Sequence, residues 1–412
     1  MEKHDDFSQV PVPQEARRGF WSMSVVMLGY TFFAASMWVG GTLGLGFRLF
    51  PDLVIVILAG NVILGLYGGL LGYASSSTGL STHMLARRAF GRSGAALPSL
   101  LLALTQIGWF GVGVSMFAYA VNKLTGIPLF PLIAVGGFMM TLTVVIGFSA
   151  LEWISRLAVP AILILGLWSM GRAVGDFGGL AALAAVEPQN PLTFSTGVAL
   201  GVGSFISGAT LTPDFIRFAK SRKEGVSATV MGFAVGNSLM FFFGALGAVA
   251  TGLSDTAEVL AAQGLLGAGI ALLTLNIWTT NDNALYASGL GLASISGMSR
   301  RMATIIGGLV GTLLADFLYN NFVGWLNFLS IFIPAIGGIL ISDFLLDAGK
   351  SKSDFMKGLT IRKVNWAAMA AWPPAVAVSM LSPAEGPLCV APLNSIVVAA
   401  AVYVIMKKYV LK

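Results

Sequence analysis

A cluster of small polar side chains lies within an apolar stretch of the sequence, "LNIWTTNDNALYASG" at 275–289. Asn276, Thr279, Thr280 and Asn283 recur at intervals of three and four residues, which places them on one face of a helix. Threonine hydroxyls and backbone carbonyls are hard oxygen ligands that suit Na⁺ better than a soft metal. The spacing predicts half of a sodium site, although structural interhelical hydrogen bonds are an alternative. Possible coupling or gating residues in the cluster are Asn281, Asp282 and Asn283.

A second stretch, "GYTFFAASMWVGG" at 29–41, interrupts aromatic side chains with small ones. A membrane helix can unwind at such a place if its neighbours satisfy the freed backbone groups. Unwound carbonyls of Gly29 and Phe32 could then face the hydroxyls of Thr279 and Thr280 and complete the sodium site. The simpler interpretation is a glycine-rich packing face.

Two further stretches supply the walls of a predicted pocket, "LTQIGWFGVG" at 104–113 and "GVGSFISGATLTPD" at 201–214. In the second, glycines and the serines Ser204 and Ser207 are expected to weaken the helix midway, and Pro213 is expected to limit its continuation. Aromatic faces stack on a flat ring, and amides read its donors and acceptors. We therefore expect a planar, polar, uncharged heterocycle as the solute. Its aromatic walls would be Phe33, Trp109 and Phe205, and its amide edges Gln106 and Asn276.

The composition indicates which elements must position these residues. Of the 412 residues, 56% are hydrophobic and only 10% are charged, whereas soluble domains carry about a quarter charged residues. The chain is therefore expected to be an integral membrane protein. The lone Cys389 excludes a disulfide framework, and the sequence lacks both a His-rich site and a phosphate-binding GxxxxGK[ST] loop. An ATP-driven pump and a metal-dependent membrane enzyme are both disfavoured.

Apolar stretches long enough to span a bilayer, roughly 20 residues each, recur about twelve times. The expected spans are 21–46, 53–79, 95–122, 129–150, 157–174, 196–218, 225–252, 263–290, 303–321, 323–347, 365–382 and 388–406. Only Arg48, Lys123 and Arg172 would lie outside, with the other 21 of the 24 basic residues on the cytoplasmic side. This bias predicts cytoplasmic termini and explains the basic charge without nucleic acid.

Interruptions in the first and sixth spans occupy corresponding positions of two five-helix halves, which is typical of inverted-repeat transporters. The expected organisation is an all-α integral membrane fold of two repeats followed by two more helices. Its parts are a tail 1–20, a first repeat 21–175, a second repeat 196–347, two helices in 365–406 and a tail 407–412. The intramembrane acids Asp214, Asp316 and Asp343 are weaker candidates, for a structural pair with Arg217, a proton relay and a gate.

Several motifs together resemble the nucleobase–cation symporter family, whose substrates are purines, pyrimidines and hydantoins. They are "TFFAASMWVGGTLG", "LTQIGWFGVGVSMFA", "VGSFISGATLTPDFIRF" and "LNIWTTNDNALYASGLG", with "VPQEARRG" at the start and "YNNFVGWLNFLS" late in the chain. The likeness covers nearly the whole chain and is specific to the cytosine branch of the family.

The resemblance implies a LeuT-like fold and sodium-coupled cytosine import across the bacterial inner membrane by a monomer in the lipid bilayer. It implies that the ring lies between Trp109 and Phe205, and that Gln106 and Asn276 hydrogen-bond the base with help from Ser204 or Ser207. The sodium ligands implied are the carbonyls of Gly29, Phe32 and Asn276 and the hydroxyls of Thr279 and Thr280. The alternatives are proton coupling through Asp282 or another acid, and a different planar base or a hydantoin as substrate.

Overall fold

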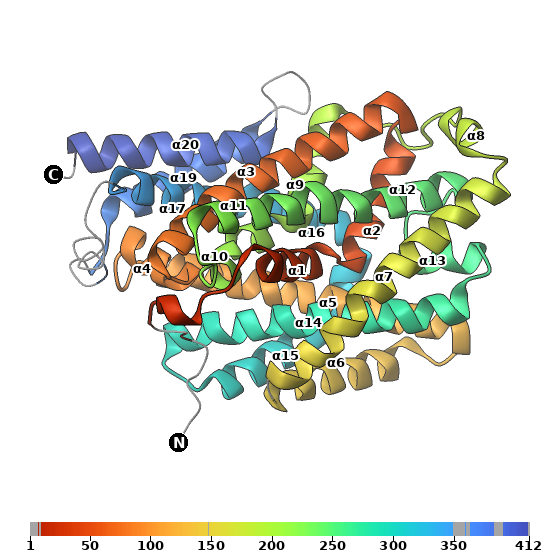
Figure 1. Cartoon of the computed structure of the whole chain (residues 1–412), viewed down its shortest axis with the longest axis horizontal. Helices are drawn as coiled ribbons and strands as arrows, with labels where there is room; N and C mark the ends of the chain where they lie inside the picture. The colour runs from red at the N-terminus through yellow and green to blue at the C-terminus, as the bar shows by residue number, and fades with distance from the viewer. Residues whose placement is uncertain are drawn as a thin grey trace.

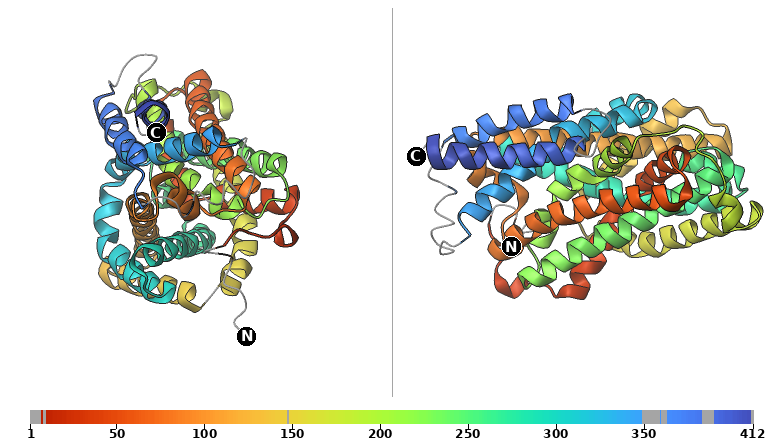
Figure 2. Two further views of the ribbon diagram at one scale, coloured as in Figure 1. Left: turned by 90° about the vertical axis from the view of Figure 1, so that its left-hand side faces the viewer. Right: turned by 90° about the horizontal axis from the view of Figure 1, so that it is seen from above.

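The computed structural model of the protein is a bundle of helices, most of which run along one long axis (Figures 1 and 2). It describes residues 7, 10–146, 148–348, 359, 363–382 and 390–410. Within these residues there is no strand, only an isolated bridge between Arg18 and Ala219. Cys389 lies outside the described residues.

Helices make up most of the residues that the structure describes. In the first half they are η1 Gln14–Ala16, α1 Phe20–Thr31, α2 Ala34–Gly46, η2 Leu49–Leu53, α3 Val54–Thr78, α4 Thr82–Phe90, α5 Ala96–Thr125, α6 Leu129–Ile146, α7 Phe148–Asp176 and α8 Leu180–Ala184. In the second half they are α9 Phe194–Thr210, α10 Thr212–Ile216, α11 Arg222–Met231, η3 Gly232–Asn237, α12 Ser238–Thr251, α13 Thr256–Ala262, α14 Leu266–Ser296, α15 Arg300–Asn320, α16 Phe322–Phe332, α17 Pro334–Leu346, α19 Trp366–Leu381, α20 Ala391–Ile405 and η4 Met406–Val410.

The helices confirm a multi-pass membrane protein. Among the described residues, seven helices are long and apolar enough to cross a membrane, or eight if the bent pair α1 and α2 is one span. Each of the twelve expected stretches falls on a helix or on consecutive helices. The twelve-span count and the inverted repeat remain predictions, because several of these helices are short or carry polar residues.

The predicted break in the first span is present. Helix α1 ends at Thr31, α2 begins at Ala34, and the two are bent by 59°. The residues between them leave the helical region, Phe32 with ψ 76° and Phe33 with φ −119° and ψ 127°. The chain therefore turns within the membrane instead of crossing it as one rod.

The predicted interruption in the sixth span is displaced from its expected place. Helix α9 continues through the glycines between Gly201 and Gly208 and ends at Thr210, and α10 begins after Leu211. An interior glycine weakens a helix by about 1 kcal/mol, which packing can offset. Pro213, near the start of α10, has no N–H to donate to the preceding turn. The proline therefore decides where the helix stops.

Small residues let α2 and α12 approach closely. A Cβ placed on Gly40 would lie 2.1 Å from the Phe241 carbonyl oxygen, and one on Gly244 would lie 1.7 Å from that of Met37. Two buried side-chain hydrogen bonds lie in the same region. The Asn237 amide accepts from the Ser36 hydroxyl at 2.7 Å and donates to the Asn61 amide oxygen at 2.8 Å. Close packing and satisfied amides together hold α2 against α3 and α12.

Three of the intramembrane acids lie outside the site described below. The Asp343 carboxylate receives Arg88, Tyr403 and Lys407, which ties α17 to α4 and α20 at the end of the bundle where α20 finishes (Figure 1). Asp214 accepts from the Thr82 backbone at 2.9 Å, and Asp316 accepts from Tyr119 at 3.0 Å. The hydrogen bonds of these acids therefore connect neighbouring helices.

The close approach of α2 and α12 predicts the effect of one added methyl group. Gly244→Ala would force a Cβ into the Met37 carbonyl and is expected to lower the stability of the protein by about 1–3 kcal/mol. Thermal unfolding in detergent measures the loss. The matched control is Gly171→Ala on α7, where nothing lies within 4 Å of the new Cβ. Equal melting temperatures for the two variants would contradict this packing.

Candidate functional site

The break in the first helix is bonded to α14 through a single side chain. The Asn276 amide donates from Nδ2 to the Phe32 carbonyl at 2.7 Å, and its Oδ1 accepts from the Ala34 backbone N–H at 2.9 Å. Asn276 is buried, with 2% of its surface exposed. Backbone groups freed in a membrane must find such partners. The amide therefore satisfies one group on each side of the break.

The break also redirects backbone hydrogen bonds within the first span. The Phe33 N–H donates to the Thr31 carbonyl, and the Ala34 N–H goes to Asn276. In an unbroken helix these two donors would bond the carbonyls of Gly29 and Tyr30, four residues earlier. The Gly29 carbonyl is thereby released from the helix ladder, as a ligand role for it requires.

Three of the oxygen atoms expected to bind sodium meet on α14. The hydroxyls of Thr279 and Thr280 donate to the Asn276 carbonyl at 2.8 and 3.0 Å. Such bonds are common for threonine within helices, so they show proximity rather than a metal. No group of three or more His, Cys, Asp or Glu that could hold a metal occurs among the described residues. The neutral oxygens present fit a hard monovalent cation.

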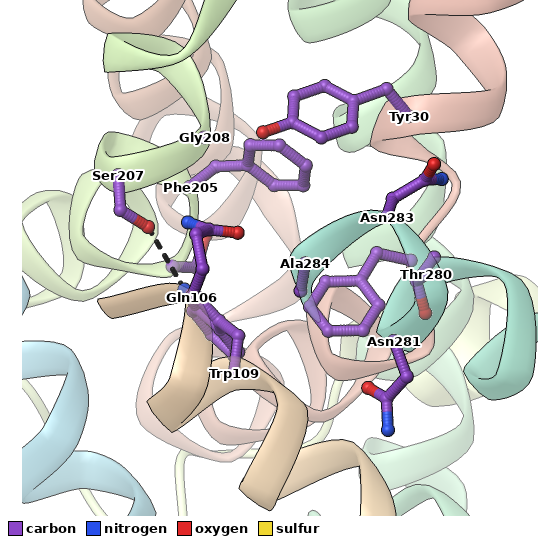
Figure 3. A pocket seen from close by; sticks show the side chains of 12 residues that line it. Tyr30, Gln106, Trp109, Phe205, Ser207, Gly208, Thr280, Asn281, Asn283 and Ala284 are labelled. Atoms are coloured by element: carbon purple, nitrogen blue, oxygen red, sulfur yellow. Dashed lines mark hydrogen bonds between the residues drawn. The ribbon is translucent and has the colours of Figure 1, made fainter. Parts of the chain in front are cut away.

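A cavity lies beside this junction, between α1, α2, α5, α9 and α14 (Figure 3). Its empty volume is about 440 Å³ with its mouth included. The residues that line it are Tyr30, Phe33, Gln106, Trp109, Ser204, Phe205, Ser207, Gly208, Thr280, Asn281, Asn283 and Ala284. All the predicted substrate-binding residues except Asn276 are among them.

Aromatic rings form much of the cavity wall. Phe33 stands edge-on to Trp109, with centroids 5.3 Å apart and ring planes at 74°, and edge-on to Phe205 at 6.5 Å. The Trp109 indole donates to the Ser207 hydroxyl at 3.0 Å, which fixes the ring in the cavity (Figure 3). Phe33 follows the break directly, so the bend of the first helix places this ring in the site.

The polar part of the lining is uncharged. Gln106 is 5% exposed, and its Nε2 donates to the Thr105 hydroxyl in a long hydrogen bond of 3.5 Å. Asn281 donates to the Phe110 carbonyl at 3.1 Å and lies over Gly113, where a Cβ would come within 2.0 Å of its Oδ1. Amide atoms of Gln106 and Asn283 face a cavity that has no cation or carboxylate in its lining (Figure 3).

Asp282 does not line the cavity. Its carboxylate accepts from the Thr143 hydroxyl on α6 at 2.9 and 3.1 Å, and Trp278 donates to the same hydroxyl. The side chain is fully buried, on a different face of α14 from Asn283. The three residues predicted for coupling or gating are therefore divided between the cavity, for Asn281 and Asn283, and the α6 contact, for Asp282.

Some lining residues were missed by the sequence reasoning. Tyr30 packs edge-on against Phe205 at 5.2 Å and against Phe215 at 4.5 Å. Its position next to Gly29 in the broken stretch was the available signal. Gly208 lies where a Cβ would come within 2.7 Å of both the Tyr30 hydroxyl and Phe205. Ala284 carries no signal of its own and follows Asn283 on α14.

Known proteins are similar to this chain in sequence and in fold. The chain is 50% identical over 406 residues to the cytosine permease of Escherichia coli K12, covering 98% of this chain and 95% of the relative. It is 26% identical over 406 residues to the hydantoin permease of Microbacterium maritypicum, covering 89% of this chain and 82% of that one.

Solved structures of Mhp1, a nucleobase-cation-symport-1 family transporter, have the same LeuT-like fold. The inward-facing conformation matches with a TM-score of 0.85 at 22% identity, covering 97% of this chain and 92% of that one. The closed conformation with bromovinylhydantoin bound matches with a TM-score of 0.83 at 22% identity, covering 98% and 95%.

The family profile described as permease for cytosine/purines, uracil, thiamine and allantoin matches residues 11–406. Together with the half-identical relative, this match makes the protein a transporter and not an enzyme. The chain belongs to the family of permeases for cytosine and purines, uracil, thiamine and allantoin.

Proposed function

We propose that this protein imports cytosine by alternating access, driven by the symport of sodium. The observation that carries the proposal is the junction of a broken first helix with α14, which brings neutral oxygens next to an uncharged aromatic cavity. The organisation proposed is that of two five-helix inverted repeats and two further helices. The transporter would act as a monomer in the bacterial inner membrane, with both termini in the cytoplasm.

The cavity lining favours a small planar solute without charge. A pyrimidine ring between Trp109 and Phe205 would stack on aromatic faces, and the Gln106 amide offers both donors and an acceptor to its edge. Asn283 also lines the cavity and adds a second amide, whereas the Asn281 amide donates to the Phe110 carbonyl. The half-identical cytosine permease supports cytosine over another base. A different planar base or a hydantoin is the alternative substrate.

The ion is proposed to bind where the two helices meet. Its ligands would be the carbonyls of Gly29, Phe32 and Asn276 and the hydroxyls of Thr279 and Thr280. Because Thr280 also lines the cavity, ion and base would occupy adjoining spaces. An ion that favours the cytosine-binding shape must raise cytosine affinity by the factor by which cytosine raises ion affinity. This reciprocity is the proposed basis of symport.

Proton coupling through Asp282 is the alternative. Its carboxylate contacts Thr143 on α6 and does not line the cavity. A proton on Asp282 would therefore act on the cavity indirectly, since the carboxylate does not touch it. The sodium proposal needs no such intermediate, since its ligands adjoin both the break and the cavity.

Removal of the two hydroxyls tests the ion site. Thr279→Val with Thr280→Val keeps the side-chain shape but deletes two proposed ligands. We expect the half-saturating sodium concentration for cytosine uptake to rise by about tenfold or more for each lost charged interaction. Thr274→Val on the same helix is the control. An unchanged sodium response in the double variant would refute this assignment.

Replacement of the cavity amide tests how the base is recognised. Gln106→Leu leaves polar atoms of the bound base without partners, which is worth about 1–3 kcal/mol per group. Cytosine affinity should fall about 5- to 150-fold, and discrimination against uracil should shrink with it. Competition of unlabelled bases against labelled cytosine measures both. Leu104→Ala, a lipid-exposed change on the same helix, should leave both values intact. Undiminished discrimination in Gln106→Leu would exclude this role.

A further inference from the structure

The Asn276 side chain makes two hydrogen bonds to a different helix, one on each side of a helix break. Its Nδ2 donor reaches the Phe32 carbonyl at 2.7 Å and its Oδ1 acceptor receives the Ala34 N–H at 2.9 Å. An amide is a planar group that offers a donor and an acceptor together. Phe33 alone separates the two backbone groups, so one amide can bridge them.

These contacts join elements that lie about 240 residues apart in the sequence. The break belongs to α1 and α2, whereas Asn276 belongs to α14, which packs against α5, α7 and α15. The backbone carbonyl of Asn276 receives Thr279 and Thr280 from its own helix. The same residue therefore holds the Phe32 carbonyl with its side chain and the hydroxyl pair with its main chain.

We propose that the Asn276 carboxamide is a positioning residue that clamps both sides of the helix break onto α14. The clamp fixes where the oxygens of α1 meet those of α14, and it places Phe33 in the cavity wall against Trp109. Through the ion ligands, this inference rests on the proposed sodium symport. It differs from the base-binding role expected from the sequence, because both ends of the amide are bonded to backbone and Asn276 does not line the cavity.

Three substitutions separate the parts of the clamp. Asn276→Leu removes donor and acceptor at similar volume, and Asn276→Ala removes them with less bulk, so that folding can be checked in two variants. Asn276→Asp keeps an acceptor for the Ala34 N–H but loses the donor to Phe32. All three keep the Asn276 backbone carbonyl. Ser36→Ala is the control, since it deletes a buried 2.7 Å bond from α2 to Asn237 without touching α14.

The clamp is tested directly by the rate of hydrogen exchange at the Ala34 amide in the purified, full-length protein. The Ala34 amide is expected to exchange about tenfold faster or more in Asn276→Leu and Asn276→Ala, as one lost hydrogen bond implies. It should stay near the wild-type rate in Asn276→Asp and Ser36→Ala. Wild-type exchange at Ala34 in both clamp-deleted variants would overturn the proposal, whether or not sodium drives transport.

The effect of the clamp on the ion site is measured by the equilibrium binding of labelled cytosine at rising sodium concentration. Asn276→Leu should raise the half-saturating sodium concentration for cytosine binding at least about tenfold. Lost cytosine affinity at saturating sodium with an unchanged sodium midpoint would overturn the proposal in favour of base contact. A wild-type protein without sodium dependence would refute the symport, and the exchange of Ala34 would then decide the clamp by itself.

Discussion

The structure depends on one constraint, which is that backbone N–H and C=O groups within a membrane must find partners inside the protein. A continuous helix meets this constraint by itself, but the first span is interrupted after Thr31. The backbone C=O and N–H groups left unpaired at the break therefore need a donor and an acceptor from another element. The Asn276 amide supplies both. The bend of 59° and the neighbouring polar face of α14 are therefore parts of one arrangement.

The remaining contacts of the site follow from this junction. The bend directs Phe33 toward Trp109 and Tyr30 toward Phe205, so two residues flanking the break line the cavity. Beyond Trp109, the aromatic contacts continue to Phe322, whose ring stands edge-on to the indole with centroids 6.3 Å apart. Trp38 stacks on Phe322 with centroids 4.1 Å apart and planes at 13°. This ring stack joins α2 to α16, helices from different halves of the chain.

Much of this arrangement could be predicted from the sequence, because periodicity and composition report which faces are apolar. Small residues between aromatics marked the break in the first span, and the i, i+3, i+4, i+7 spacing marked the polar face of α14. The periodicity of a helix identifies its polar face but not the element that packs against that face. Asn276 was therefore assigned to the base, although its amide bonds the backbone of the first span. The position of the second interruption was misjudged because glycines were given more weight than Pro213. Tyr30 was overlooked since only the bend turns it into the cavity.

We propose that sodium binding at the junction of the broken helix and α14 drives the uptake of the base. The most direct measurement is the accumulation of labelled cytosine in proteoliposomes under an imposed sodium gradient or, in sodium-free buffer, an imposed proton gradient. We expect accumulation above equilibrium with an inward sodium gradient alone and none with an imposed proton gradient alone. Accumulation driven by protons in the absence of sodium would contradict it and would assign the coupling to a buried carboxylate such as Asp282.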